Sequence, residues 1–318
     1  MPRRGQVAKL FFATDIHGSE RCFRKFLNAA AFYGAGYLVL GGDITGKTVV
    51  PIERCSDGYR AIVDGREHTG LDEEGRAAVE RLLRDRGQYP LVGSHDLLEQ
   101  LENDEEREQL FVTVVKESIV RWVELAEQRL VGTNVRCFIT PGNDDYFQID
   151  EILQGSSKVE FVEGKLVSLE DHQMVTTGYS NPTPWHTPRE MNEDALGSYI
   201  RSMYAEVSDT SSMIMVLHPP PYGTRLDQAP AINEEFRLEV RGGEVQMRAV
   251  GSRAVRELIE EAQPLLALHG HVHESAAEQL LGRTLCVNPG SEYTTGILRG
   301  ALIGLGRDRV ESHQVVAG

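Results

Sequence analysis

Apolar runs and helical stripes alternate along the first fifty residues. Residues 7–14 read V-A-K-L-F-F-A-T, a nearly continuous apolar run that is typical of a strand covered on both faces. A helical stripe follows, with Ser19 placed to cap its start and Gly34 to end it. A second apolar run spans residues 37–40. This alternation predicts parallel strands joined by right-handed helical crossovers.

The same pattern resumes at residues 135–140, another run typical of a buried strand. A helix is expected at 252–262, because Ser252 can cap its start and Pro264 stops it. The proline-rich segment 181–188 predicts an ordered loop. Further strands are expected at 159–169, 173–178, 213–217, 265–268, 284–287, 301–305 and 309–315.

Residues 46–131 interrupt the alternation and are interpreted as an insertion. Strands are expected at 49–53 and 59–64, where Asp64-Gly65 indicates a turn. Helices are expected near 72–86 and 105–130, and their Glu and Arg residues are typical of solvated faces. The length of the segment, and its position just after Asp43, suggest a lid or the contact surface of a homodimer.

Length and composition are those of an ordinary globular protein. The 318 residues are 41% apolar and 25% charged, which is enough to bury a full core. No apolar run approaches the length of a membrane span, and residues 1–5 precede no apolar export-signal region. The four cysteines form no CxxC pair, so we expect a reduced, cytoplasmic protein and no thiolate metal ligands. The cysteines are Cys22, Cys55, Cys137 and Cys286.

The formal net charge of −15 limits the class of partner. Tight binding to nucleic acid depends on cationic side chains that neutralise phosphates, so we do not expect it here. Metal ions bound among the carboxylates would make a site much less negative than the rest of the surface. The negative net charge together with a less negative metal site therefore favours a small phosphorylated substrate over a long polyanion.

Five short stretches each place a metal-capable side chain just after an apolar strand. Ligand sites of open α/β sheets form at that end of the strands. Glycine beside four of the stretches lets the backbone turn sharply and removes side chains that would crowd an ion. Each stretch alone is weak evidence, but the joint occurrence of all five is improbable by chance. They are Asp15-x-His17, Gly42-Asp43, Gly142-Asn143, His218 and Gly270-His271-x-His273.

This ordered set resembles the calcineurin-like metallophosphoesterase superfamily, and the resemblance covers essentially the whole chain. It implies an α/β fold: a two-layer β-sandwich of mixed sheets flanked by helices (α/β/β/α), with a helical insertion after the second strand. Residues 1–318 would form a single domain of this type, with the insertion at about 46–131. Residues 288–291, N-P-G-S, resemble the turn after the final strand of many of these enzymes.

The resemblance also implies a dinuclear centre with Asp43 bridging two ions. One ion would be held by Asp15, His17, Asp43 and His273, and the other by Asp43, Asn143, His218 and His271. Such nitrogen and oxygen ligands suit Mn, Fe, Zn, Ni or Co better than Ca or Mg. Two bridged ions about 3.5–4 Å apart share a water whose pKa falls to about 7. The expected activity is therefore phosphoester hydrolysis by a metal-bridging hydroxide.

The chain departs from the family pattern at Asp144, which is followed by Asp145. Many members carry a histidine at position 144, where it contacts the phosphate and assists the leaving group. A carboxylate with a pKa near 3.9 is ionised at neutral pH and repels a phosphate oxygen. This favours a diester, which carries less charge than a monoester. The alternatives are a phosphate- or metal-binding scaffold whose catalysis has decayed, and a single-metal hydrolase of amides or lactones.

Two residues outside the ligand set are further candidates. His186 would supply the missing acid or touch the substrate; alternatively, it is a surface histidine beside Trp185. Arg225 would bind phosphate bidentately, or it is an exposed surface arginine.

Overall fold

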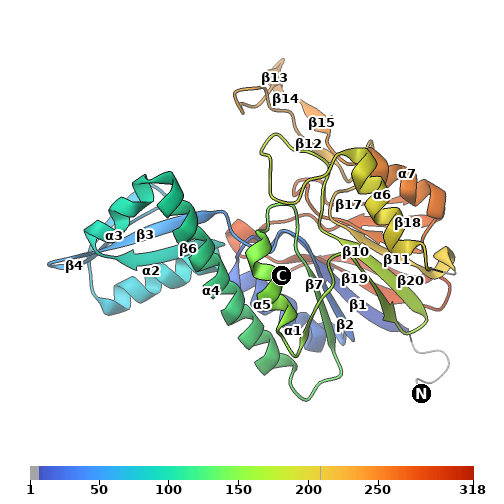
Figure 1. The fold of residues 1–318 in the computed structure, drawn as a ribbon, viewed down its shortest axis with the longest axis horizontal. Coiled ribbons are helices and arrows are strands. Elements are labelled where there is room, and N and C mark those ends of the chain that lie inside the picture. The colour runs from blue at the N-terminus through green and yellow to red at the C-terminus, as the bar shows by residue number, and fades with distance from the viewer. Residues whose placement is uncertain (1–6, 208) are drawn as a thin grey trace.

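Two six-stranded sheets, stacked face to face, form the centre of the computed structural model, which describes residues 7–207 and 209–318 (Figure 1). The basic residues 1–5, from which no export signal is expected, lie outside the described residues. The first sheet has the order β20-β19-β1-β2-β7-β8 and the second the order β17-β18-β16-β11-β10-β9.

In the first sheet four strands run parallel: β1 (Ala8–Ala13), β2 (Tyr37–Gly41), β7 (Arg136–Thr140) and β8 (Val159–Phe161). Two antiparallel strands complete it, β19 (Arg299–Leu305) and β20 (Val310–Ala317). The parallel strands all end at the same edge of the sheet. The loops that follow β1, β2 and β7 therefore meet there.

The second sheet also has four parallel strands: β10 (His172–Thr177), β11 (Ile214–Leu217), β16 (Leu266–Leu268) and β18 (Thr284–Asn288). Its edges are the antiparallel strands β9 (Lys165–Leu169) and β17 (Ala277–Leu281). Both sheets are mixed, as the resemblance implies.

Alternate residues of β1 serve two different cores. Phe12 belongs to the cluster between the sheets, with Val39, Phe138, Val216 and Leu268, whereas Phe11 packs outward with the helices. Successive side chains of a strand point to opposite faces, so a strand buried on both faces needs the continuous apolar run of its sequence.

Helices cover the outer face of each sheet. On the first sheet lie α1 (Glu20–Tyr33), α4 (Asp104–Leu130) and the short α5 (Asp150–Gln154), with Phe23 stacked on Trp122 at 4.2 Å between ring centroids. On the second sheet lie α6 (Glu193–Tyr204) and α7 (Arg253–Ala262). The expected α/β/β/α sandwich is therefore confirmed.

The structure divides the segment 46–131 into two parts. A separate lobe contains β3 (Thr48–Cys55), β4 (Gly58–Val63), β5 (Arg66–Leu71), α2 (Glu73–Asp85), β6 (Gln88–Gly93) and α3 (His95–Glu99), and it extends to one side of the sandwich (Figure 1). Its sheet has the order β5-β4-β3-β6, with its own core around Ile52 and Leu83. In contrast, α4 packs into the main core through Ile119 and Trp122.

Several elements differ from the sequence prediction. The single strand expected at 159–169 is two strands, β8 and β9, in different sheets, because the chain turns at Gly164 with φ of 66°. The strands β5 and β6 and the helix α6 were not predicted. Also unpredicted is an arm of short strands, β12 (Gln228–Pro230), β13 (Val240–Arg241), β14 (Glu244–Val245) and β15 (Met247–Ala249).

The predicted helix boundaries are confirmed. The Ser19 side chain accepts from Cys22 N, Ser252 accepts from Val255 N, and Gly34 ends α1 in the left-handed conformation. Short 3-10 helices complete the fold at Gln100–Glu102, Phe147–Ile149, Thr210–Ser212 and Tyr293–Thr295. All four cysteines are free. Within the described ranges, no helix combines the length and apolar character needed to cross a bilayer.

Candidate metal centre

The carboxyl ends of five strands converge on one site between the two sheets. From the first sheet come Asp15 and His17 after β1, Asp43 after β2 and Asn143 after β7. From the second come His218 after β11, and His271 and His273 after β16. The structure thus brings all seven sequence-predicted metal ligands together.

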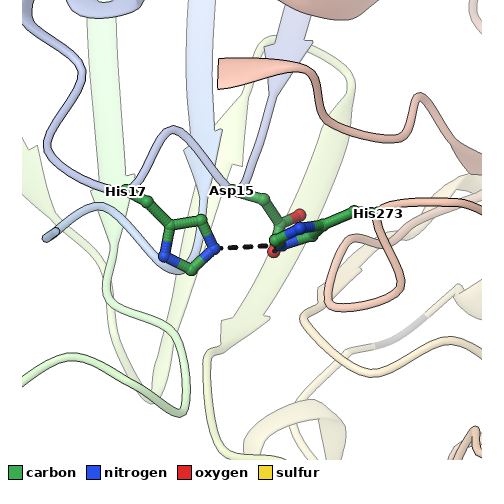
Figure 2. A group of neighbouring side chains, drawn as sticks. All are labelled: Asp15, His17 and His273. Carbon is green, nitrogen blue, oxygen red and sulfur yellow. Dashed lines mark hydrogen bonds and ion pairs between the residues drawn. The ribbon is translucent and has the colours of Figure 1, made fainter. Parts of the chain in front are cut away.

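Asp15, His17 and His273 form the first group of candidate ligands, with ligand atoms all within 4.8 Å of one another. The Nε2 atoms of His17 and His273 are 3.0 Å apart and face each other beside the Asp15 carboxylate (Figure 2). His273 Nε2 lies 3.4 Å from Asp15 Oδ1. This is the set that the resemblance implies for one ion, apart from the shared Asp43.

The second group contains Asp43, His218 and His271, again with ligand atoms within 4.8 Å of one another. Asn143 joins it, because its Oδ1 lies 2.8 Å from His271 Nδ1. His218 Nδ1 lies 3.0 Å from the carbonyl oxygen of Gly41, which leaves Nε2 facing the carboxylates. That contact fixes the orientation of the ring, as outer contacts commonly do for metal-binding histidines.

The Asp43 carboxylate lies between the two groups. Its Oδ2 is 3.8 Å from His17 Nε2, and its Oδ1 is 3.4 Å from His218 Nε2. One oxygen therefore faces each group, which is the position required of a carboxylate that bridges two ions.

The backbone at the centre is strained. Asp15, His17, Asp43 and His271 all have positive φ, between 38° and 67°. Non-glycine residues in this region cost about 1–3 kcal/mol each and persist where the surroundings hold them. The turns are held together by hydrogen bonds from Asp15 N to the Gly42 carbonyl and from His17 N to the Asp43 carbonyl, both 3.0 Å.

Glycine is required beside the ligands. A Cβ on Gly42 would lie 2.2 Å from His218 Nδ1, and one on Gly142 would lie 2.1 Å from Asp43 Oδ1. A Cβ on Gly270 would lie 2.3 Å from Asp15 Oδ2. Any side chain at these positions would displace a candidate ligand. The glycines therefore make room for the ligands, whereas the sequence predicted that they make room for an ion.

The electrostatics of the centre fit a bound cation. Burial lowers the pKa of His17 to about 3 and that of His271 to about 4, so both rings are neutral and able to ligate. Burial would also lower the pKa of His218, but the Asp43 carboxylate raises it to about 10. A positive charge is thus favoured beside Asp43. His218 Nε2 is buried and lacks a hydrogen-bond partner among the described residues, an arrangement that a metal ion would relieve.

The segment 288–291 supports the ligand loops from behind. Ser291 Oγ donates to the Asp15 carbonyl at 2.6 Å, and Asn288 Nδ2 donates to the Val272 carbonyl at 2.9 Å. Tyr293, just beyond, lies over the His17 ring with 4.8 Å between centroids. Sequence reasoning missed Tyr293, although its position two residues after the recognised turn was an available signal.

Asp144 also lies at the centre, but it is not a free carboxylate. One of its oxygens lies within 4.8 Å of ligand atoms of His17 and Asp43, and it forms an ion pair with Lys47 Nζ. Burial and the neighbouring Asp43 raise the pKa of Asp144 to about 7. The expected repulsion of phosphate by an isolated, ionised Asp144 therefore needs correction, because the Lys47 ammonium offsets its charge. Lys47 was not recognised from the sequence.

Two cavities meet beside the centre. The larger, of about 860 Å³, includes Asp43, Asn143, His271 and His273 in its lining. The smaller, of about 530 Å³, is bounded by the inserted lobe and α4, with Phe111 and Tyr146 in its lining. Both cavities are lined by Lys47, Asp144 and Trp185.

The two remaining candidates lie outside the ligand cluster. His186 is exposed, has φ of 52°, and lines the smaller cavity together with Asp144. Arg225 is exposed and belongs to the lining of neither cavity.

Comparison with known proteins relates the fold to solved structures. No family model matches the sequence. The uncharacterised protein MJ1162 of Methanocaldococcus jannaschii is 30% identical over 152 residues, which span 47% of this chain and 61% of that protein. The structure of TT1561 of Thermus thermophilus aligns with a TM-score of 0.55 at 12% identity, over 98% of this chain and 99% of the other.

A further crystal structure aligns with a TM-score of 0.56 at 15% identity, over 98% of this chain and 99% of its own. At these identities the two alignments show a shared fold. The structure brings together the ordered ligand set that carries the resemblance to the calcineurin-like metallophosphoesterase superfamily.

Proposed function

We propose that the protein is a metal-dependent phosphoester hydrolase with a dinuclear centre. The observation that carries this proposal is the position of Asp43, whose two carboxylate oxygens face His17 and His218 in two separate ligand groups. Four of the seven ligands, Asp15, His17, Asp43 and His271, lie on strained backbone. The buried carboxylates among the ligands are costly to maintain without a cation, because unpaired charges in a protein interior are unfavourable.

The ligand set is the basis for choosing the metals. Asp15, His17, Asp43 and His273 would hold one ion, and Asp43, Asn143, His218 and His271 the other. Imidazole and carboxylate donors suit Mn, Fe, Zn, Ni or Co. When bound, such a pair supplies a hydroxide nucleophile at neutral pH and neutralises two phosphoryl oxygens. The chain's own contribution is to orient the ligands and to hold the phosphoryl group where the two cavities meet.

We favour a small phosphodiester over a monoester because of the two cavities. They meet at Lys47 and Asp144, next to the candidate ligands, so there is room for an organic group on each side of a phosphoryl group. A monoester has a substituent on one side alone.

Asp144 is also the observation that favours a second candidate function. It stands where many relatives have a histidine, so a phosphate- or metal-binding scaffold with decayed catalysis is the alternative. The two candidates differ in turnover, because a scaffold would bind metal and phosphate without hydrolysing an ester.

The proposal is tested by loading the protein in turn with Mn²⁺, Zn²⁺ and Ni²⁺ and measuring bound metal and hydrolysis of an aryl diester and an aryl monoester. We expect close to two ions per chain and faster hydrolysis of the diester. Asp43→Asn is the matched inactive control. Metal binding without turnover of either ester would favour the scaffold, and a clear preference for the monoester would refute the diester assignment.

Two further expectations remain proposals: a cytoplasmic location, and a homodimer formed through the segment 46–131. The molar mass in solution, measured by light scattering before and after deletion of the lobe at residues 48–99, tests the dimer.

A further inference from the structure

Lys47 is a cation brought to the candidate metal centre by the inserted lobe. It lies between the loop that follows β2 and the start of β3, and its ammonium forms an ion pair with Asp144. The Lys47 side chain is 54% exposed, whereas that of Asp144 is 15% exposed. An ammonium has three N–H donors. Asp144 lies on one side of the Lys47 ammonium, so the donors on its exposed side can bind a second anion.

The lobe is attached to the ligand loops by close backbone contacts at Gly46, next to Lys47, and at Gly87. A Cβ on Gly46 would lie 2.1 Å from the Gly87 carbonyl oxygen, and one on Gly87 would lie 2.0 Å from the carbonyl oxygen of His17. Tyr89 Oη accepts a hydrogen bond of 2.8 Å from Gly46 N. These contacts tie the start of the lobe and its turn at Gly87 to the loop that carries His17, a candidate ligand. The position of Lys47 is therefore coupled to that of the centre.

The arginines that line the two cavities contact other side chains. Arg253 lies over the Tyr222 ring at 4.0 Å from its centroid, Arg248 pairs with Glu239, and Arg107 pairs with Asp104. Lys47 is the cationic residue shared by the linings of both cavities. A phosphoryl group with one substituent in each cavity would thus have its non-bridging oxygens close to this ammonium.

We propose that Lys47 is a substrate-contacting residue that binds a non-bridging phosphoryl oxygen with its ammonium. In this arrangement Asp144 is a positioning residue that holds the ammonium beside the centre. The pair is neutral when Asp144 is ionised and positive when Asp144 is protonated, so in neither state does a net negative charge repel an anion. A charge-assisted hydrogen bond from an ammonium to a phosphate oxygen is stronger than a neutral one. This inference deepens the proposed function and rests on it for the identity of the substrate.

The test compares Lys47→Met, Lys47→Arg and Asp144→Asn in the full-length, metal-loaded protein. Calorimetry measures the binding of inorganic phosphate, and bound metal is quantified in parallel. We expect Lys47→Met to weaken phosphate binding by about 10- to 100-fold at unchanged metal content, because a charged hydrogen bond is lost. Lys47→Arg keeps the charge, so it should restore most of the binding. Lys116→Met, an exposed site on α4, is the control for loss of a lysine.

Asp144→Asn separates substrate contact from a structural role of the ion pair. If Lys47 binds phosphate, Asp144→Asn retains most of the binding, because the ammonium remains and a nearby negative charge is removed. Equal losses in Lys47→Met and Asp144→Asn would indicate that the pair merely supports the loops, and would overturn the proposal. So would phosphate binding by Lys47→Met within twofold of wild type.

The measurement of phosphate binding does not depend on turnover. The proposed hydrolase activity and the proposed role of Lys47 can therefore be refuted independently of each other. Absence of hydrolysis of any ester would remove the proposed activity but leave the phosphate contact measurable. Where turnover is seen, kcat/KM for the aryl diester should fall in parallel with phosphate binding across the Lys47 variants.

Discussion

Asp145 and Thr45 join the two turns that carry Asn143 and Asp43. Asp145 Oδ1 accepts hydrogen bonds from Thr45 N at 2.8 Å and from Thr45 Oγ1 at 2.5 Å. Its Oδ2 accepts from Ile44 N at 3.0 Å and from Gly142 N at 2.7 Å. The carboxylate is fully buried, so its four hydrogen bonds couple the ends of β2 and β7.

We therefore expect Asp145→Asn to lower the free energy of unfolding by about 2–4 kcal/mol, because the amide NH₂ faces buried N–H donors that it cannot satisfy. Urea unfolding measures the loss, and bound metal should fall with it. Asp64→Asn, at a 61% exposed side chain, is the matched control and should change stability by no more than about 0.5 kcal/mol. Equal stability of Asp145→Asn and wild type would contradict this role.

Replacement of Asp43 tests whether this carboxylate is shared by the two candidate metal sites. In Asp43→Asn each ligand group loses a charged oxygen at once, so bound metal should fall from about two ions per chain to below one, with turnover lost. Elemental analysis after gel filtration gives the stoichiometry. Asp171→Asn, at an exposed turn, is the control. Full retention of both ions by Asp43→Asn would rule out a shared ligand.

Removal of metal should destabilise the protein. A ligand that binds the folded state alone stabilises it by about 2.7 kcal/mol when present at 100 times its Kd. The melting temperature should thus fall on treatment with a chelator and recover with Mn²⁺ or Zn²⁺. In Asp43→Asn the chelator should have little effect, which serves as the control. An unchanged melting temperature in the wild type would argue against metal bound to the folded state.

Gly87 tests the attachment of the inserted lobe. Both Gly87 and Gly65 have positive φ, 78° and 73°, but a Cβ on Gly87 would collide with the His17 carbonyl, whereas Gly65 has open space. Gly65→Ala should cost about 1 kcal/mol for backbone strain alone. Gly87→Ala should cost a further 1–3 kcal/mol or so for the clash, and should weaken metal binding. Thermal and urea unfolding measure both variants; similar costs would contradict the close contact.

Trp122 tests the assignment of α4 to the main core. It is 4% exposed and stacks on Phe23, so Trp122→Ala should lower the free energy of unfolding by about 3–5 kcal/mol. Trp185, 64% exposed, is the control, and Trp185→Ala should stay within about 0.5 kcal/mol of wild type. Urea titration followed by circular dichroism distinguishes them. A small loss of unfolding free energy in Trp122→Ala would indicate that α4 does not unfold together with the main core.

Much of the sandwich followed from the sequence because its strands are buried on both faces. Such strands require unbroken apolar runs, as in residues 7–14, and their ends are marked by glycine and polar side chains. Elements without that signal were missed. All residues of β5 except Leu71 are exposed, so its sequence carries no burial pattern. The sequence of residues 159–169 predicted one strand and did not indicate that the chain passes from the first sheet to the second at Gly164.

The sequence by itself determined which seven side chains end the buried strands, and hence the candidate metal ligands. Their identity and order depend on local signals: an apolar run, a glycine, and a carboxylate or imidazole. Only the tertiary structure decided that Lys47 meets Asp144, because this contact depends on where the inserted lobe attaches to the His17 loop. No local pattern encodes such an attachment, since it arises from close backbone packing between segments that are distant in the chain.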